Sequence, residues 1–288
     1  MPTRTRKQTA KKKKTGARKS RSGPTQASTA DRYVLYQRSV QAPESEIDFF
    51  LKVFRKHYNR KPTTLREDFC AAAYLCCEWV KAHKDNVAVG LDIDPEPIKW
   101  GLEHNADGLN QDQFSRLHLH ELNVLDPAAA KQKAEVVYAG NFSYCCFKTR
   151  KQLLEYFTAA RKGVAKDGIF VCDIFGGPDS QRVGEEETEY EGFTYVWDQN
   201  QYDPISSEIL CHIHFLFEDG SEWRKAFTYD WRLWTIAEIR EVLMEAGFAS
   251  TEVYWEGSNS KGEGNGVFSK KEKVENEDAW VTYIVGLP

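Results

Sequence analysis

One stretch of sequence decides the fold class that the rest of the chain supports. It is Val87-Ala88-Val89-Gly90-Leu91-Asp92-Ile93-Asp94-Pro95. Residues 87–92 form a short apolar run that ends on a carboxylate, a pattern typical of a buried strand in a parallel sheet. Asp94 followed by Pro95 indicates a helix start, because Asp caps the first turn and Pro fits the first helical position. The stretch therefore predicts a strand, an acidic turn and a helix over residues 95–105.

The same alternation extends on both sides of this stretch. A helix is predicted at 43–58, where apolar residues recur at helical spacing behind the acidic first turn of Glu44 and Glu46. Further strands are predicted at 64–68, 117–122, 134–139 and 168–175, with helical segments through 79–83 and over 149–164. Strands separated by helices predict an α/β fold, a mostly parallel sheet covered by helices on both faces.

Ligands of such a sheet bind beyond the carboxyl ends of the strands, near the point where the strand order reverses. The chemistry is therefore expected in the loops after Asp68, Asp92, Leu122, Ala139 and Phe175.

The last third of the chain has a different pattern. Strands are predicted at 193–199, 208–217 and 222–229, with a hairpin turn at Asp219-Gly220. A helix is predicted at 235–246, and final strands at 251–255 and 280–285 are separated by the glycine-rich loop 257–266. In total we expect a seven-stranded main sheet. The antiparallel insertion at 193–231 is expected on the substrate side, before the last helix.

Composition narrows the class of protein. With 288 residues and 41% apolar content, the chain can form a sizeable core. No run of 18–20 apolar residues and no apolar leader segment are present, which favours a soluble, cytoplasmic protein without membrane contact. Seven cysteines, none in a CxxC pair, fit neither a disulfide framework nor a zinc site. We interpret them as buried thiols, with a nucleophilic cysteine as the alternative.

Charge separates the N-terminus from the rest. Residues 1–30 contain ten Lys or Arg residues, all within 4–21, and no acid, whereas residues 31–288 carry a net charge of −14. With almost no apolar residues, 1–30 is expected to be a disordered basic tail ahead of a domain at 31–288. A nucleic-acid contact through residues 4–21 is one interpretation, and a solubilising extension is the other. In a eukaryote the tail would also fit nuclear import.

Asp92 has the strongest functional interpretation from the residues alone. A carboxylate at the end of the second strand can accept both ribose hydroxyls of an adenosine. The alternative is a solvated strand end, with Asp94 as a helix cap. The loop 67–73 reads Glu-Asp-Phe-Cys-Ala-Ala-Ala and contains no glycine, so its pattern alone indicates only a strand-to-helix turn with two acids.

Several motifs in their order resemble one family. They are Glu67-Asp68-Phe69-Cys70, GLDIDPEPIKWG at 90–101, Asn141-Phe142-Ser143-Tyr144, Phe147-Lys148-Thr149-Arg150, AFTYDWRLW at 226–234, YWEG at 254–257 and GEGNGVF at 262–268. Over residues 33–286 the chain resembles a mostly bacterial, largely uncharacterised family of class I methyltransferases with a Rossmann-like fold, which use S-adenosyl-L-methionine.

The resemblance implies a role for each matching position. Glu67 and the loop from Phe69 would hold the methionine end of the cofactor, Asp92 the ribose, and Asn123 the adenine. The full cofactor-binding set it implies is Glu67, Phe69, Cys70, Ala71, Asp92, Ile93, Asn123, Val124 and Asn141. Asn141, Tyr144 and Asp230 are expected at the reacting centre, where Asn141 would lie beside the sulfonium methyl group. The alternative for Asn141 is an Asx turn.

The chain departs from this family at Ala71-Ala72, where the family usually has Gly-Thr. A side chain on a left-handed backbone costs about 1–2 kcal/mol. Either the turn tolerates alanine, or cofactor affinity falls, or the chain is a catalytically impaired binding or scaffold protein whose basic tail contacts RNA. A nicotinamide-dependent oxidoreductase would need GxGxxG after the first strand, and that motif is absent.

Weaker patterns leave alternatives open. The pairs His118-x-His120 and His212-x-His214 each fall on one strand face, but we expect hydrogen-bonded histidines and no metal. Aromatic residues in the last third are core residues or the walls of an acceptor pocket. They are Tyr195, Trp197, Tyr229, Trp231, Trp234 and Trp255. The candidates for a proton acceptor are Asp173, Asp198, Asp230 and His214, and the methyl acceptor itself is not identified.

Overall fold

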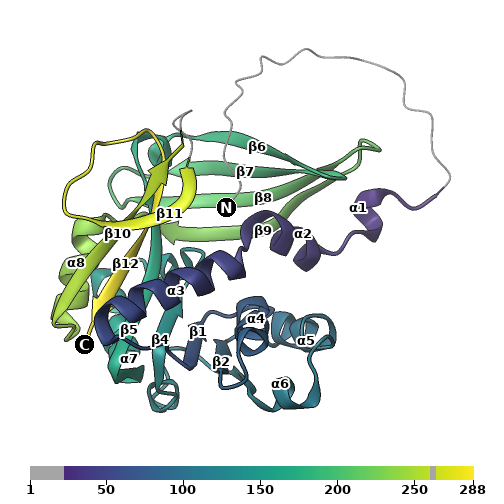
Figure 1. The fold of residues 1–288 in the computed structure, drawn as a ribbon. Helices are drawn as coiled ribbons and strands as arrows, with labels where there is room; N and C mark the ends of the chain where they lie inside the picture. The colour runs from purple at the N-terminus through teal and green to yellow at the C-terminus, as the bar shows by residue number, and fades with distance from the viewer. Residues whose placement is uncertain (1–22, 260–263) are drawn as a thin grey trace.

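A computed structural model describes residues 23–259 and 264–288. Its centre is an eight-stranded sheet in the order β11-β10-β12-β5-β4-β1-β2-β3 (Figure 1). The strands are β1 Thr64–Asp68, β2 Val87–Asp92, β3 Leu117–Glu121, β4 Ala134–Ala139, β5 Val164–Gly176, β10 Ser250–Ser258, β11 Gly264–Lys271 and β12 Trp280–Leu287. The five strands β5, β4, β1, β2 and β3 are parallel, and β12, β10 and β11 extend the sheet in antiparallel pairing.

The strand order reverses between β1 and β4. The chain runs outward from β1 through β2 to β3 and then returns to β4 on the other side of β1. Ligands of doubly wound sheets bind at such a reversal, beyond the carboxyl ends of the strands. The loops after β1, β2 and β4 therefore define where a site is expected.

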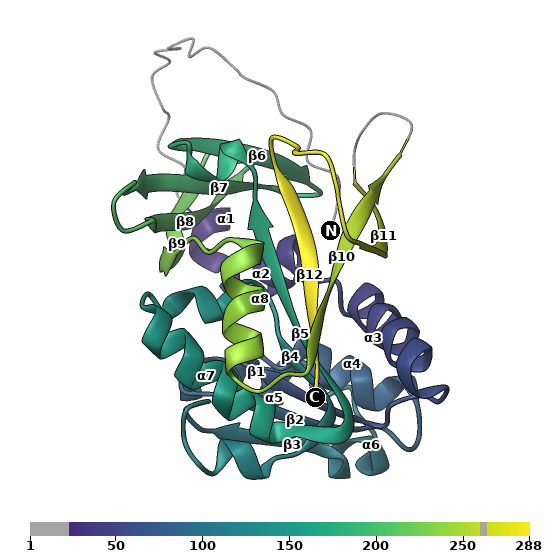
Figure 2. The same cartoon turned by 90° about the vertical axis from the view of Figure 1, so that its left-hand side faces the viewer.

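Helices cover both faces of this sheet. Figure 2 shows α3 Pro43–Tyr58 and α4 Tyr74–Ala82 on one side, and α7 Arg150–Gly163 and α8 Ile236–Glu245 on the other. Side chains alternate along each strand, so Val136 of β4 packs in the core cluster with α3 and α4, and Val137 packs in the cluster with α7 and α8. Three short helical elements lie between β2 and β4 in the chain: α5 Pro95–His104, α6 Gln111–Ser115 and η1 Ala129–Lys131.

Sequence signals explain where several helices begin. Asp94 caps α5 by accepting the Glu96 N–H at 3.0 Å, as predicted. Both α7 and α8 begin with a capping box, formed by Thr149 with Gln152 and by Thr235 with Glu238. No helix among the residues that the structure describes is long and apolar enough to cross a membrane.

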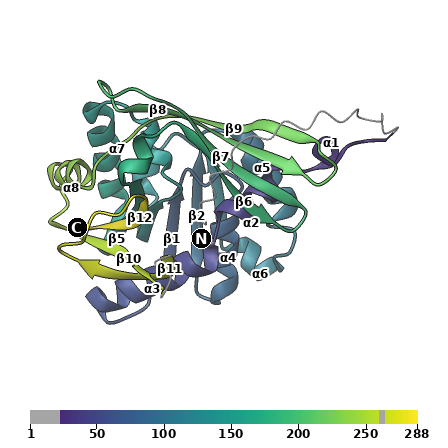
Figure 3. The ribbon, with the colours of Figure 1, turned by 90° about the horizontal axis from the view of Figure 1, so that it is seen from above.

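A second sheet of four antiparallel strands lies between β5 and α8 in the chain. Its strands are β6 Gly184–Tyr190, β7 Phe193–Tyr202, β8 Glu208–Phe217 and β9 Glu222–Arg232. Two short 3-10 turns, η2 Ser143–Cys146 and η3 Pro178–Gln181, follow β4 and β5. Seen from above, the antiparallel sheet reaches over α2 and α5 (Figure 3).

Helix α2, Arg32–Val40, joins the two sheets. Its cap Asp31 accepts the indole N–H of Trp100 in α5 at 2.7 Å, and Leu35 packs in the core of the antiparallel sheet. The preceding helix α1, Gln26–Thr29, is bonded to the β8–β9 turn through Asp219 and Ser221. Helical structure thus begins at Gln26, within the segment 1–30 that the sequence predicts to be a disordered tail. Residues 1–22 of that segment lie outside the described residues.

Two strands were not predicted. The main sheet has eight strands rather than seven, because the last three residues of the expected loop 257–266 begin β11. The insertion begins at Gly184 rather than 193, because β6 pairs along its whole length with β7. In other respects the predicted architecture is confirmed: a mostly parallel sheet, helices on both faces and an antiparallel insertion before the last helix.

Candidate active site

The loop after β1 has the backbone that a cofactor-binding turn requires. Phe69, Ala71 and Ala73 have φ angles of 61°, 46° and 53°, so every second residue is left-handed. The turn closes through the Ala73 N–H, which donates to the Cys70 carbonyl at 2.7 Å. Each non-glycine residue in this region costs about 1–2 kcal/mol. The strain expected at Ala71 is therefore present, and a similar strain occurs at Ala73.

Close packing from β2 and α5 compensates for this strain. Gly101 lets α5 approach so closely that a Cβ there would lie 2.2 Å from the Ala72 carbonyl oxygen. The Asn105 side-chain amide donates to that same oxygen at 2.8 Å. Under the loop, the Cys70 N–H donates to the Leu91 carbonyl at 3.0 Å. The loop is thus fixed by contacts from β2 and from α5 with its C-cap.

Asp92 connects this loop to the second strand. Its carboxylate accepts the Ala71 N–H at 2.8 Å and the Asp94 N–H at 2.9 Å. Burial raises its pKa, and these backbone hydrogen bonds act against that shift. Each carboxylate oxygen keeps a second acceptor position, which is what two vicinal hydroxyls would need. The next residue, Ile93, is 65% exposed and presents an apolar side chain beside the carboxylate.

Glu67 lies beneath the loop rather than on its surface. It is buried and accepts the thiol of Cys76 at 3.1 Å. Burial, together with the nearby charges of Glu46 and Asp92, raises its pKa to about 8. Glu67 therefore sits at the reversal point without a cationic partner among the described residues.

The two residues proposed from the loop after β3 differ in placement. Asn123 is exposed, and its side-chain oxygen accepts the Leu125 N–H at 2.9 Å, which forms an Asx turn. Val124 is buried in the core cluster on the α7 side. Its side chain is therefore occupied by packing, and only its backbone remains for a ligand contact.

The loop after β4 is shaped by Asp173. Asn141 and Phe142 have φ angles of 54° and 58°, and their N–H groups donate to the two carboxylate oxygens of Asp173 at 2.8 and 2.9 Å. Asp173 is 3% exposed, and burial raises its pKa to about 7. The Asx turn considered for Asn141 does not form, since the Ser143 N–H donates to the Gly140 carbonyl instead.

Two residues expected at the reacting centre make other contacts. Tyr144 is fully buried, and its hydroxyl donates to the backbone carbonyl of Asp173 at 2.7 Å. Asp230 is exposed and forms an ion pair with Lys148. Tyr144 thus packs beneath Asp173, and Asp230 forms a surface ion pair. A role of either residue at the reacting centre stays a prediction.

Aromatic side chains of the antiparallel sheet face the loop after β4. The rings of Tyr229 and Trp231 are 4.3 Å apart, and the Trp197 ring lies 6.0 and 6.3 Å from them. Trp231 also approaches Phe142 at 6.3 Å. The predicted aromatic cluster therefore exists for these three residues, which we call the aromatic face. Within it Trp231 is buried in the core, as are Trp234 and Trp255 outside it.

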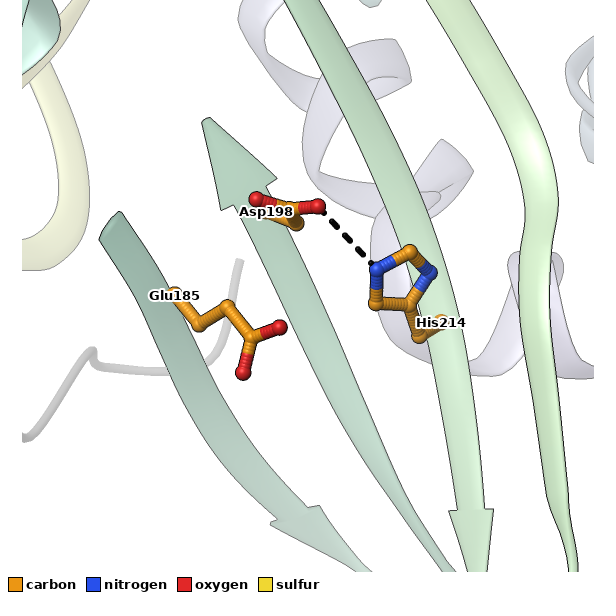
Figure 4. Close-up of side chains that lie close together, drawn as sticks. All are labelled: Glu185, Asp198 and His214. Carbon is orange, nitrogen blue, oxygen red and sulfur yellow. Dashed lines mark hydrogen bonds and ion pairs between the residues drawn. The ribbon is translucent and has the colours of Figure 1, made fainter. Parts of the chain in front are cut away.

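The histidines of β8 form a separate polar cluster. His214 bonds to Asp198 at 3.2 Å, and Glu185 from β6 lies beside this pair (Figure 4). The Lys225 N–H donates to Nδ1 of His214 at 2.8 Å, so Nε2 carries the proton that it donates to Asp198. A metal-binding histidine uses an unprotonated nitrogen for the metal and donates a proton from the other. Here the nitrogen that faces Asp198 is the protonated one, so this arrangement does not suit a metal. Glu185 is moreover paired with Arg224.

Sequence reasoning did not find two parts of this region. Tyr36 of α2, whose hydroxyl interacts with that of Tyr229, was not singled out. Neither was the fully buried pair of Arg66 with Asp68, to which the Tyr156 hydroxyl also donates. A signal existed for the pair, since two charges inside a predicted buried strand need each other.

Comparison with solved structures identifies the fold. A S-adenosylmethionine-dependent methyltransferase from Clostridium acetobutylicum aligns with a TM-score of 0.64 at 14% identity, over 88% of this chain and 97% of that one. CcbJ, a methyltransferase from Streptomyces caelestis, aligns at 0.62 and 14% identity, over 86% and 96%. CalS10, an amino pentose methyltransferase from Micromonospora echinaspora solved with the cofactor, aligns at 0.61 and 12% identity, over 89% and 96%.

The chain therefore has the Rossmann-like fold of class I methyltransferases, as predicted. Its sequence matches no protein-family model and no curated protein.

Proposed function

We propose that this protein transfers a methyl group from S-adenosyl-L-methionine to an acceptor held between the main sheet and the aromatic face. The hydrogen bond between Asp92 and the left-handed loop at Ala71 carries the proposal. It joins a carboxylate suited to a ribose to a turn suited to the methionine end, at the reversal point of the sheet. The solved methyltransferases of similar fold support the same cofactor.

The residues present fit this cofactor in three ways. The turn from Phe69 to Ala73 carries three left-handed residues at the reversal point, a conformation that brings backbone rather than long side chains toward a ligand. Asp92 keeps acceptor positions for two ribose hydroxyls, and Ile93 offers an exposed apolar surface for an adenine ring. Asn123 would contact the adenine edge from the neighbouring loop, and Cys70 and Val124 would contribute backbone contacts.

S-adenosyl-L-methionine supplies an activated methyl group, so the protein needs no nucleophile or metal for the transfer. The chain contributes alignment: the loop after β1 fixes the donor, and Asn141 beside it positions the acceptor. Water is excluded by the aromatic face and by α2, which bridges the two sheets. Glu67 remains beneath the donor as a buried carboxyl suited to a cationic group.

A separate proposal concerns the N-terminus. Ten positive charges within residues 4–21, on a chain that is otherwise acidic, favour an electrostatic contact with nucleic-acid phosphates. This contact is independent of the methyl-transfer site, and the cofactor affinity would not depend on it.

The experiment for the main proposal is binding followed by transfer. Full-length protein is titrated calorimetrically with S-adenosylmethionine and with its demethylated product, and is then incubated with methyl-labelled cofactor and cell extract. We expect binding of both ligands and label in one class of product. Absence of any binding at millimolar ligand would overturn the proposal.

A further inference from the structure

Two buried carboxyls near the loop after β4 have no cationic partner among the described residues. Asp173 is 3% exposed and Glu46 is 8% exposed. Asp173 accepts only backbone N–H groups, and Glu46 accepts the Tyr138 hydroxyl at 3.1 Å. Two other buried acids have cationic partners, Asp68 with Arg66 and Glu252 with two lysines and a histidine, whereas Glu67 beneath the loop after β1 has none among the described residues. An unpaired buried carboxylate is costly, so these two favour a positively charged ligand.

Phe142 connects Asp173 to the aromatic face, since its N–H donates to Asp173 and its ring lies 6.3 Å from that of Trp231, and the charge of Glu46 adds to the rise in the pKa of Asp173. Burial raises the pKa of Tyr36, and the charges of Asp173 and Glu46 add to that rise, so α2 lies within range of both acids. The Tyr36 hydroxyl in turn interacts with Tyr229. In the sheet, Tyr283 of β12 lies opposite Asp173 of β5. Burial raises the pKa of Tyr283, and the charges of Glu46 and Asp173 raise it further.

The surrounding groups are those that bind an alkylated or protonated amine. Tyr229, Trp231 and Trp197 present neighbouring rings, and the electron-rich faces of Trp and Tyr attract cations within about 6 Å. The Asn141 side-chain amide has no hydrogen-bond partner within residues 23–259 and 264–288, so its oxygen is free to accept an N–H. Phe142 links the two regions, since its N–H bonds to Asp173 and its ring lies 6.3 Å from Trp231.

We propose that the methyl acceptor is a small amine, bound as its ammonium form between the carboxyls of Asp173 and Glu46 and the aromatic face, with Asp173 as the group that takes its proton. This inference rests on the proposed methyl transfer and names the class of acceptor. Asp173 is chosen over Glu46 because both of its oxygens lie directly under the Asn141–Phe142 backbone.

The proton and electron balance is simple. The ammonium gives one proton to the Asp173 carboxylate, which leaves a lone pair on the nitrogen. That lone pair forms the new N–C bond while the C–S bond breaks and its electron pair stays on sulfur. The products are the N-methylated ammonium and the neutral thioether, and the proton on Asp173 passes to solvent. Burial raises the pKa of Asp173 to about 7, which suits a group that takes up and releases a proton near neutral pH.

The test uses matched probes on full-length protein saturated with the demethylated cofactor. Benzylamine is compared with benzyl alcohol, cyclohexylamine with cyclohexanol, and glucosamine with glucose, by tryptophan fluorescence of this complex. Label transfer is measured separately, on protein incubated with the methyl-labelled donor in place of the demethylated cofactor. We expect at least one amine to bind about tenfold more tightly than its alcohol and to be the labelled product. Asp173→Asn should remove this preference, and Glu245→Gln, in the exposed ion pair with Arg150, should keep it.

A second variant covers the case in which Asp173→Asn does not fold. Trp231→Leu should weaken amine binding more than alcohol binding, because it removes one cation-binding ring. Equal binding of amines and alcohols, alcohol labelling, or no amine bound at millimolar concentration would each overturn the inference. Because binding of the demethylated cofactor is measured first, its failure would instead count against the proposed function.

Discussion

The carboxylate of Asp92 accepts the backbone N–H of Ala71 at 2.8 Å, across two strands that are neighbours in the sheet. This contact fixes the left-handed turn in which Ala71 has a φ of 46°. It also orients Asp92 so that the remaining acceptor positions of its oxygens face away from the loop. One hydrogen bond thus couples the two halves of the candidate cofactor site.

Replacing Ala71 with glycine should stabilise the protein. Glycine adopts a positive φ without the cost of a Cβ, so we expect the free energy of unfolding to rise by about 1 kcal/mol. The affinity for S-adenosylmethionine should rise or stay equal, because the loop no longer carries a methyl group at this position. Urea unfolding and calorimetry measure the two effects.

The matched control is Ala72→Gly. Ala72 is buried and is not among the residues with positive φ, so glycine there loses a packed methyl group and gains chain entropy in the unfolded state. We expect a loss of about 1 kcal/mol. Destabilisation by both substitutions would contradict the strained turn.

The buried acids predict how stability depends on pH. Burial raises the pKa of Glu67 to about 8, and those of Glu46 and Asp173 to about 7, from ordinary values of 4.5, 4.5 and 3.8. Between about pH 4 and pH 8 the folded state therefore binds more protons than the unfolded state, so the free energy of unfolding falls as pH rises. Urea unfolding at several pH values should show this slope.

Glu67→Gln serves as the comparison for that slope. Removing the most shifted of the three groups should flatten the decrease in its upper part, near pH 7 to 8. The opposite result would be an increase in the free energy of unfolding of the unmodified protein from pH 5 to pH 8. It would contradict the prediction and show that these carboxyls are ionised in the folded state.

The ion pair of Arg66 with Asp68 predicts a strong effect on stability. Both side chains are fully buried, so Asp68→Asn leaves the guanidinium without a counter-charge and should cost about 3–5 kcal/mol. Glu208→Gln changes the exposed pair with Lys148 and should cost less than about 1 kcal/mol. Similar losses for the two variants, measured by urea unfolding, would argue against the buried pair.

The basic tail gives a prediction about nucleic acid. Removing residues 2–22 should abolish salt-sensitive binding to single-stranded RNA, whose logarithmic salt slope is about −0.7 for each phosphate neutralised. Affinity for the demethylated cofactor should stay the same in this variant. Unchanged RNA binding without the tail would reject the contact.

Much of the parallel sheet could be predicted from the sequence, because buried strands such as 87–92 and 134–139 are short apolar runs between helix signals. Strand β6 could not, since Gly184–Tyr190 is rich in glutamate, a residue that isolated strands disfavour. Its partner β7 supplies the pairing, and charges on an edge strand prevent association with other sheets.

The candidate site was predicted unevenly for a similar reason. Asp92 and the loop after β1 could be located because their position in the topology determines their surroundings. The contacts of Tyr144 and Asp230 could not be predicted, because the sequence does not show that the Tyr144 hydroxyl donates to the Asp173 carbonyl or that Asp230 pairs with the distant Lys148. Their roles at the reacting centre stay predictions.

The most direct test of the account is the affinity of Asp92→Asn for S-adenosylhomocysteine, compared with Asp94→Asn. Asp94 caps α5, and asparagine caps a helix about as well as aspartate, so its variant should keep its stability and bind normally. The Asp92 variant loses a charged acceptor for the ribose, and calorimetry should show affinity reduced by roughly 10- to 150-fold, as expected for a hydrogen bond to a charged group. Equal affinities for the two variants, or no binding by the unmodified protein, would contradict the placement of the cofactor.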